Sequence, residues 1–268
     1  MRPGISQLRR LLSEATSLIA GEPSMLRIEA EKVLVVGDTH GDLESTLKGF
    51  QMAERYGSNI LFLGDYVDRG PQQIENICEI LERKLENPRR VHLLRGNHET
   101  VSMNEVYGFY DVVSRYYGGE VYRLFAGLFA ELPYTAIIGG DVLCLHGGLP
   151  EGVTDVGQLS SLGKGALEPE DRVVVQLLWN DPDEDVEGFQ PSPRGGMARL
   201  FGGDVLTRFM ERNRLRLLIR AHQPVADGYA YLFGKRLLTV FSCRYYGLRP
   251  RAALISGKEI SIEVLDYV

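Results

Sequence analysis

Five short apolar segments, each followed at once by a polar turn, constrain this chain more than any other feature of its sequence. Apolar runs of this length are typical of strands buried on both faces of a sheet. Two amphipathic stretches, Leu43–Tyr56 and Gln72–Leu85, separate the first three, and Pro71 opens the second as a favoured first helical residue. This alternation predicts βαβ units with right-handed crossovers. The five segments are Val33–Val36, Ile60–Leu63, Val91–Leu94, Val142–Leu145 and Leu215–Ile219.

The C-terminal part of the chain has strand-like segments with little helix between them. Ser256–Gly257 is typical of a hairpin turn between two of these segments. We therefore expect a second, mostly antiparallel sheet packed on the first. We also expect residues 181–187 and 190–196 to form exposed loops. The expected strands are Tyr229–Phe233, Leu237–Phe241, Ala252–Ile255 and Ile260–Leu265.

Length and composition favour a single domain. With 268 residues, of which 44% are hydrophobic, the chain can bury one sizeable core, and no linker rich in Pro, Gly or Ser divides it. Near the start, apolar residues recur at helical spacing. We expect residues 1–30 to be a helical extension of one domain that spans 31–268. The residues with this spacing are Leu8, Leu11, Leu12, Ala15 and Ile19.

Charge and cysteine content argue against several classes of partner. The net charge of −6 disfavours nucleic acid and anionic membranes, both of which select clustered Lys and Arg. No apolar run approaches the roughly 18–20 residues that span a bilayer, and we expect no signal peptide. The three widely separated cysteines make neither a disulfide framework nor a zinc cluster, so we expect a cytoplasmic protein.

Metal-binding residue types follow the apolar segments. Ligands of open α/β sheets bind outside the carboxyl ends of the strands, so these turns are expected to converge. Imidazole nitrogens, carboxylate oxygens and amide oxygens are suitable ligands for Mn²⁺, Fe²⁺ or Zn²⁺. Two such ions need one carboxylate that bridges them. The turns read GDTHG at 37–41, GDYVDRG at 64–70, RGNHE at 95–99, HGG at 146–148 and RAHQ at 220–223.

Each turn also has a simpler interpretation. GDTHG alone is an ordinary turn, Asp68 and Arg69 alone make an ion pair, and Asn97 alone caps a helix. Together these interpretations fail, because four of the five histidines of the chain lie in the turns. The fifth, His92, lies inside an expected strand, and we interpret it as a core or sheet-face residue.

Over residues 33–247 the sequence resembles the phosphoprotein phosphatase family of Ser/Thr phosphatases, within the calcineurin-like metallophosphatases. The broader class shares GDTHG, GDYVDRG and GNHE in this order. The narrower family is indicated by LFLGDYVDRG, LLRGNHE, YGFYD at 107–111, LCLHGGL, LLWNDPD at 177–183 and RAHQ. The resemblance implies an α/β fold with a central two-sheet β-sandwich flanked by helices, and it is stronger to archaeal or bacterial members than to eukaryotic ones.

The resemblance also implies roles for individual residues. Asp38 and His40 would hold one metal, Asp65 would bridge both, and the second metal would have three further ligands. His98 would be the general acid, oriented by Asp68. Arg69 and Arg194 would grip the phosphate with the help of Asn97, and Tyr107 and Tyr246 would line the substrate groove. The metal ligands are Asp38, His40, Asp65, Asn97, His146 and His222.

The implied reaction is hydrolysis of phosphomonoesters on phosphorylated proteins. A hydroxide bridging two divalent ions would attack phosphorus in line, with no phosphoenzyme. Mn²⁺ is our first expectation, with Fe, Zn, Co or Ni as alternatives, and phosphotyrosine is an additional expected substrate. The alternatives are a symmetrical diadenosine tetraphosphate hydrolase and a catalytically dead scaffold. Regulatory proteins cannot be identified from the sequence, and we expect neither nucleic acid nor membrane as a partner.

The chain departs from the family in one loop. Eukaryotic members carry Ser-Ala-Pro-Asn-Tyr-Cys where this sequence reads SCRYYG at 242–247. Tyr246 is kept, the cysteine after it is lost, and Arg244 adds a positive charge. We therefore expect no covalent capture by the cyclic peptide toxins that act on the family. Asp181, Asp183, Glu184 and Asp185 form an acidic run that either favours basic substrates or is a solvated loop.

Overall fold

The strands of the βαβ units lie in one sheet of the computed structural model, which describes residues 2–265. β2 (Lys32–Val36), β3 (Asn59–Phe62) and β4 (Val91–Leu93) are parallel neighbours, and α2 (Leu43–Tyr56) and α3 (Gln73–Glu86) connect them. The predicted alternation of strand and helix is therefore confirmed. Each helix supplies the crossover connection that two parallel neighbouring strands need.

Local sequence explains where α2 begins and ends. Asp42 caps its N-terminus, because the carboxylate accepts the backbone N–H of Ser45. Gly57 ends the helix in the left-handed conformation at φ 63°. The cap follows directly on the GDTHG turn, so the helix position and the turn position are linked.

The second sheet has six strands in the order β1-β5-β6-β10-β12-β11. β6 (Val142–Leu145), β10 (Leu217–Arg220) and β12 (Leu237–Val240) are parallel neighbours in its middle. β1 (Met25–Ile28) pairs parallel to β5 (Thr135–Ile138) at one edge, and neither strand was expected from the sequence.

The expected partition of strands between the sheets was wrong. β13 (Arg251–Ser256) and β14 (Glu259–Val264) do not form a sheet with β11 (Tyr229–Leu232) and β12. Instead β13 pairs antiparallel with β2, while β11 and β12 extend the sheet of β10. Apolar content shows that a strand is buried but not which open edge it pairs with, so the sequence left this choice open.

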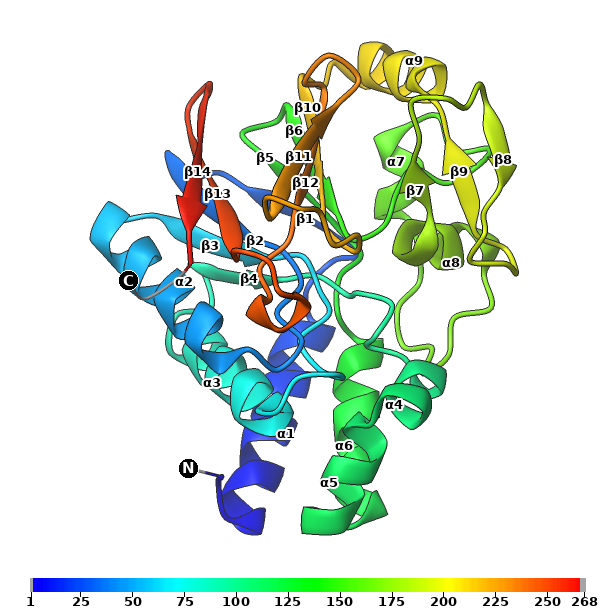
Figure 1. The fold of residues 1–268 in the computed structure, drawn as a ribbon. Coiled ribbons are helices and arrows are strands. Elements are labelled where there is room, and N and C mark those ends of the chain that lie inside the picture. The colour runs from blue at the N-terminus through cyan, green and yellow to red at the C-terminus, as the bar shows by residue number, and fades with distance from the viewer. Residues whose placement is uncertain (1, 266–268) are drawn as a thin grey trace.

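The two sheets pack face to face, and helices cover the outer face of the β2–β4 sheet. Val33, Val35 and Leu61 point into the sandwich, where they meet residues such as Ile219 and Leu238 of the other sheet. Alternate residues, such as Leu34 and Phe62, point the other way into the helical layer. Figure 1 shows the two sheets side by side, with α1 (Ile5–Ala20), α3, α5 (Phe109–Tyr117) and α6 (Gly119–Ala130) below them.

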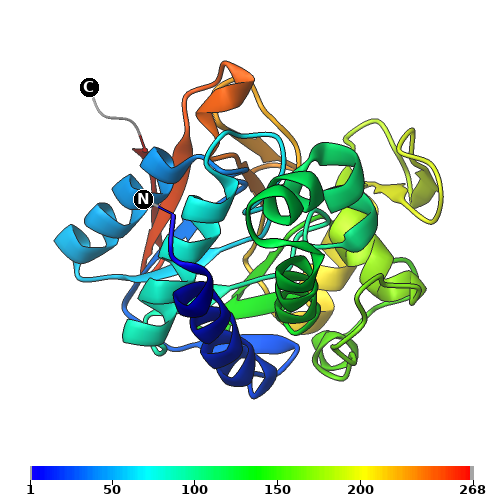
Figure 2. The same ribbon diagram turned by 90° about the horizontal axis from the view of Figure 1, so that it is seen from below.

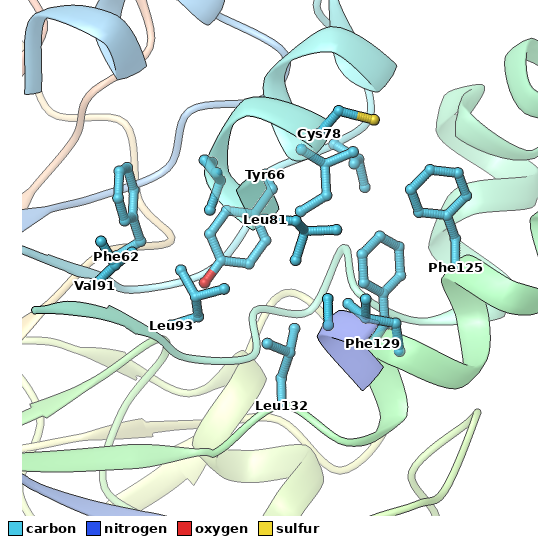
Figure 3. Packing of buried hydrophobic residues seen from close by; sticks show 14 of the residues in the cluster. Phe62, Tyr66, Cys78, Leu81, Val91, Leu93, Phe125, Phe129 and Leu132 are labelled. Carbon is cyan, nitrogen blue, oxygen red and sulfur yellow. The ribbon is translucent and has the colours of Figure 1, made fainter. Parts of the chain in front are cut away.

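Aromatic and aliphatic side chains fill the space between the β2–β4 sheet and the helices (Figure 3). Tyr66 is fully buried there, and its hydroxyl donates to the carbonyl of Leu94 at 2.6 Å. Leu81 from α3 and Phe125 and Phe129 from α6 pack in the same cluster. This layer holds the ends of β3 and β4 in fixed positions.

The remaining elements lie around the two sheets (Figure 1). α4, α5 and α6 extend the helical layer, and the small three-stranded sheet β7-β9-β8 lies beside the second sheet with α7–α9. No helix among residues 2–265 is both long enough and apolar enough to cross a bilayer. The remaining elements are α4 (Val101–Tyr107), α5 (Phe109–Tyr117), α6 (Gly119–Ala130), α7 (Val156–Ser160), α8 (Arg172–Trp179), β7 (Asp181–Pro182), β8 (Phe189–Pro191), β9 (Arg199–Phe201), α9 (Gly203–Asn213) and the 3₁₀ turn η1 (Arg244–Tyr246).

The N-terminal helix α1 (Ile5–Ala20) lies between α3 and α6 (Figure 2). The five apolar residues expected at helical spacing all point into the core of the helical layer. We therefore propose that residues 1–30 belong to the same domain as the sandwich. Residues 266–268 of that expected domain lie outside the described residues.

Leu12→Ala tests this proposal. Leu12 is fully buried, so we expect the free energy of unfolding to fall by about 2–5 kcal/mol in a single cooperative denaturant transition. Ser13→Ala on the exposed face is the matched control and is expected to change it by less than about 0.5 kcal/mol. A separate early transition for α1 would show that the helix is not part of this domain.

Candidate metal centre

The polar turns converge where the carboxyl ends of the strands of both sheets meet. Asp38 and His40 follow β2, Asp65 follows β3, and Asn97 follows β4. His146 and His222 follow β6 and β10 of the other sheet. All six side chains are buried. The expected convergence of these turns is thus found in the structure.

The backbone at these turns adopts an uncommon conformation. Eight non-glycine residues among residues 2–265 have positive φ, and five of them lie in this region: His40, Asp65, Asp68, Arg69 and His222. Such residues cost roughly 1–3 kcal/mol each and cluster at functional sites. All five residues lie in the turns that follow β2, β3 and β10.

Asp65 lies at the middle of the cluster. One candidate metal-binding group contains His40, Asp65 and His98, and a second contains Asp65, His146 and His222. Asp65 Oδ2 lies 3.6 Å from His40 Nε2, and Asp65 Oδ1 lies 3.4 Å from His146 Nε2. The two carboxylate oxygens of one residue therefore face the two groups.

The other ligand candidates complete the two groups. Asp38 Oδ2 lies 3.8 Å from His40 Nε2 on one side. On the other side, His146 Nε2 lies 2.9 Å from Asn97 Oδ1 and 3.2 Å from His222 Nδ1. The six residues predicted as ligands thus lie close together, and the group of His40 and Asp65 also contains His98.

Backbone carbonyls orient two of the imidazoles. His40 Nδ1 lies 2.8 Å from the carbonyl of Val67, and His146 Nδ1 lies 3.0 Å from the carbonyl of Leu63. A carbonyl oxygen only accepts hydrogen bonds, so Nδ1 donates in both rings. The Nε2 lone pair of each ring is then directed at the cluster, which is the arrangement of a metal-ligating histidine.

His98 is held differently from the other histidines. Its Nδ1 lies 2.8 Å from Asp68 Oδ2, and Asp68 also accepts from Asn104 Nδ2 and from the backbone N–H of Phe109. The ring contacts His40 edge-on, with 4.7 Å between ring centroids. Asp68 therefore fixes the ring and faces it with negative charge, and His98 reaches the same pocket as the ligands.

The carboxylates carry a shared negative charge. Burial raises the pKa of Asp38 to about 7, and the charge of Asp65 adds to this effect. Burial would also raise the pKa of Asp65, but His146 and His98 outweigh it and hold this pKa well below its ordinary value. Two adjacent buried carboxyl groups thus compete for positive charge, which favours cation binding.

The imidazoles divide by pKa. Burial lowers the pKa of His40 to about 3 and holds the pKa of His222 well below its ordinary value, so both rings are neutral. Burial also acts to lower the pKa values of His98 and His146, but nearby carboxylates, Asp65 foremost, raise both above the ordinary value. Neutral imidazole is the ligating form, so His146 would release a proton from Nε2 when it binds a metal.

A pocket of about 260 Å³ opens onto the cluster. Arg69 lines it, and its guanidinium carbon lies 4.2 Å from the centroid of the Tyr107 ring and 5.8 Å from that of Tyr246. Arg194, Trp179 and Met103 line the pocket as well. All five predicted substrate-binding residues therefore line the same cavity: Arg69, Asn97, Arg194, Tyr107 and Tyr246.

Asp181 is a residue that the sequence analysis assigned wrongly. We expected 181–187 to be an exposed loop, but Asp181 is 4% exposed and lies in β7. It accepts Arg194 Nε at 2.5 Å and a terminal nitrogen of the buried Arg220 at 2.8 Å. Its two arginine partners come from distant segments, so local sequence carried no signal of this burial. The expectation holds for Glu184, Asp185 and Glu187, which are exposed.

Glu99 supports the centre without lining the pocket. Its buried carboxylate accepts the backbone N–H groups of Asp65, Tyr66 and Gly96. Gly96 has no room for a side chain, because a Cβ there would lie 2.2 Å from Asp65 Oδ1. Glu99 thus joins the turns after β3 and β4 and holds Asp65 in place.

The residues present fit two divalent cations. The donors are carboxylate, imidazole and amide oxygen, the set preferred by borderline-hard divalent metals. His222 Nε2 is buried and has no hydrogen-bond partner within residues 2–265. That nitrogen lies 4.0 Å from Asp181 Oδ1, while Nδ1 of the same ring lies 3.2 Å from His146 Nε2 and is the atom placed to bind a cation.

Comparison with known proteins supports this assignment. Residues 31–226 match the calcineurin-like phosphoesterase family. A protein serine/threonine phosphatase from Saccharomyces cerevisiae, with similarity to human phosphatase PP5, has a similar structure with a TM-score of 0.90 and 30% identity. The match covers 99% of this chain and 91% of the yeast chain.

Two further solved structures share the fold. A cold-active protein-tyrosine phosphatase of a psychrophilic Shewanella species has 18% identity and a TM-score of 0.66, over 93% of this chain and 84% of its own. A putative diadenosine tetraphosphatase has 18% identity and a TM-score of 0.53, over 91% of this chain and 98% of its own. The family match, the full-length similarity and the site together lead to one assignment. The chain belongs to the calcineurin-like phosphoesterases, which depend on a dinuclear metal centre, and within them to the phosphoprotein phosphatase type.

Proposed function

We propose that this chain hydrolyses phosphomonoesters on serine and threonine side chains of phosphorylated proteins. The observation that carries the proposal is the similarity to the yeast protein serine/threonine phosphatase over 99% of this chain at 30% identity. The pocket agrees with it, because two arginines and a histidine–aspartate pair surround the candidate metal ligands.

The positions of the buried donors support the proposed metal-binding roles. Asp38 and His40 would hold one divalent ion, and Asp65 would contact both ions. When bound, such ions act as Lewis acids that lower the pKa of water and offset phosphate charge. Mn²⁺ stays our first prediction, with Fe, Zn, Co or Ni as alternatives. The ligands proposed for the second ion are Asn97, His146 and His222.

His98 would deliver a proton to the leaving group. The Asp68 carboxylate accepts from His98 Nδ1 at 2.8 Å, so Nδ1 keeps its proton and Nε2 is the atom that can donate. Nearby carboxylates favour the protonated ring. The departing serine or threonine oxygen leaves as an alkoxide unless it is protonated, so a proton donor on this side lowers the barrier.

Arg69 and Arg194 would bind the phosphate oxygens. A guanidinium keeps its charge and offers paired N–H donors, which match phosphate geometry. Asp181 accepts from Arg194 Nε and leaves the terminal nitrogens of Arg194 for the substrate. The amide of Asn97 lines the same pocket and would add a further contact. Together these groups would favour charge that develops on the equatorial oxygens.

Burial of the cysteines supports direct attack by water on phosphorus. Cys78, Cys144 and Cys243 are all buried, and none of them lines the pocket. Burial raises the pKa of the Cys78 and Cys243 thiols to about 12. A thiolate is the reactive form of cysteine, so these thiols are poor candidates for a phosphoenzyme.

A comparison of substrates tests the proposed function. After metal reconstitution, we expect kcat/KM for a phosphothreonine peptide to exceed that for diadenosine tetraphosphate by about 10-fold or more, because the similarity to the yeast protein phosphatase is greater than that to the putative diadenosine tetraphosphatase. A phosphotyrosine peptide in the same series tests the expected dual specificity. Faster turnover of the dinucleotide would overturn the proposal in favour of a nucleotide hydrolase, and no turnover of any substrate would favour a scaffold.

A further inference from the structure

The loop between β12 and β13 carries Tyr246 into the pocket. The Tyr246 ring packs against Phe241 and His40, with centroid distances of 4.9 Å and 5.7 Å. It also forms one of the two aromatic walls beside the guanidinium of Arg69. The position of this ring therefore affects both a proposed metal ligand and a proposed phosphate-binding arginine.

Few contacts fix the loop on the side of Tyr246. Ser242 is anchored, because its hydroxyl accepts the N–H of Gly37 and donates to the carbonyl of Arg251. Beyond it, Tyr245 is 48% exposed. Gly247, in the left-handed conformation at φ 70°, is exposed as well. The anchor closest to Tyr246 that binds another segment is Arg244, within the 3₁₀ turn η1.

Arg244 grips the buried carboxylate of Asp42. Its Nε lies 3.0 Å from Asp42 Oδ2, a terminal nitrogen lies 2.7 Å from Asp42 Oδ1, and its backbone N–H donates to Oδ2 at 2.9 Å. A second terminal nitrogen pairs with Glu44. The Asp42 side chain is fully buried, while that of Arg244 is 26% exposed. A two-pronged pair with a buried carboxylate fixes geometry better than a surface ion pair does.

Asp42 connects this grip to the metal centre. It directly follows the turn that contains His40, its N–H donates to the carbonyl of Thr39, and it caps α2 through Ser45. Arg244 therefore joins the Tyr246 loop to the same rigid element that positions His40. Neither Asp42 nor Arg244 lines the pocket, so neither belongs to the catalytic and binding groups proposed above.

We infer that Arg244 is a positioning residue that holds Tyr246 as the wall of the phosphate pocket, through its paired bonds to Asp42. The inference rests on the proposed phosphoester hydrolysis at this site. Because Arg244 does not touch substrate, its loss should weaken phosphate binding through Tyr246 and Arg69 and leave the proton transfer by His98 in place. The kinetic signature is a raised KM at nearly constant kcat.

The test compares Arg244→Ala with Arg249→Ala, an exposed arginine on the same loop. On a phosphothreonine peptide we expect Arg244→Ala to raise KM about 10-fold with kcat within about 2-fold, since small misplacements of a binding group are costly. Arg249→Ala should match the wild type. Arg244→Lys should recover only part of the loss, because an ammonium cannot bind both carboxylate oxygens as a guanidinium does.

A double-variant cycle with Tyr246→Ala separates positioning from a general structural role. In the Tyr246→Ala background, Arg244→Ala should cause no further change in KM, since its effect passes through the ring. An independent, multiplicative effect in the double variant would overturn the inference. So would a KM of Arg244→Ala equal to that of Arg249→Ala, or a fall in kcat and melting temperature with KM unchanged.

Binding of inorganic phosphate to the Mn²⁺-loaded variants, followed by calorimetry, needs no turnover. We expect its Kd to rise by the same factor as KM in Arg244→Ala. A wild type that binds phosphate but hydrolyses no phosphopeptide would refute the proposed function, and the Kd values would still decide the role of Arg244. An unchanged Kd in Arg244→Ala would refute the positioning role alone.

Discussion

His98→Asn is expected to lower kcat for a phosphothreonine peptide by about 10²–10⁴-fold, the contribution of a positioned general acid. The resemblance assigns His98 the role of proton donor and not of ligand, and the Asp68 carboxylate faces its Nδ1 at 2.8 Å. Asparagine cannot supply the proton that the leaving alkoxide needs. Elemental analysis of the purified variant should therefore show the same metal content as the wild type.

The matched control is His92→Asn. His92 lies on β4, half-buried and outside the pocket, and its ring contacts Asn59. We expect this variant to keep kcat within about 2-fold, since surface and partly buried substitutions away from a site have small effects. If His98→Asn instead lost metal, His98 would be a ligand, in agreement with its presence in the group with His40 and Asp65.

Asp65→Asn is expected to have the second large effect, a loss of metal binding. Asp65 belongs to both candidate metal groups, so the substitution should weaken the binding of both ions. We expect metal affinity to fall by about 100-fold or more, because loss even of an outer partner of a metal ligand costs 10–100-fold. Activity at fixed low Mn²⁺ should fall with it and recover in part at high Mn²⁺.

Two variants make this result specific. His222→Ala removes a ligand from one group only, so it should reduce the metal content toward one ion per chain. Asp141→Asn changes a surface carboxylate paired with Arg216 and should leave the metal content at two. Equal loss of metal in Asp65→Asn and His222→Ala would contradict a bridging role for Asp65.

Much of the fold could be predicted because its strands are short, buried and followed by unusual turns. The helix Leu43–Tyr56 was found with the same bounds as α2, since Asp42 and Gly57 mark both ends. The site could be predicted because its residues lie directly after strands, where local sequence and position coincide. Four histidines in a chain with only five left little room for a structural explanation.

The features of the fold and the site that could not be predicted depend on contacts between distant segments. The pairing of β13 with β2 was missed because either sheet offered an edge that a buried strand could extend. Asp181 was taken for a loop residue, since its burial depends on Arg194 and Arg220. The bond between Asp42 and Arg244 joins residues that are 202 positions apart, and no local pattern marks it. Such side-chain pairs appear only once the chain is folded.

The central claim is that this pocket hydrolyses phosphoproteins with two divalent ions held around Asp65. The most direct measurement is a titration of the metal-free protein with Mn²⁺, with hydrolysis of a phosphothreonine peptide and bound metal recorded on the same samples. We predict no hydrolysis without metal and saturation of activity at two ions per chain. Full activity in the presence of a chelator, or saturation at a single ion, would contradict the account.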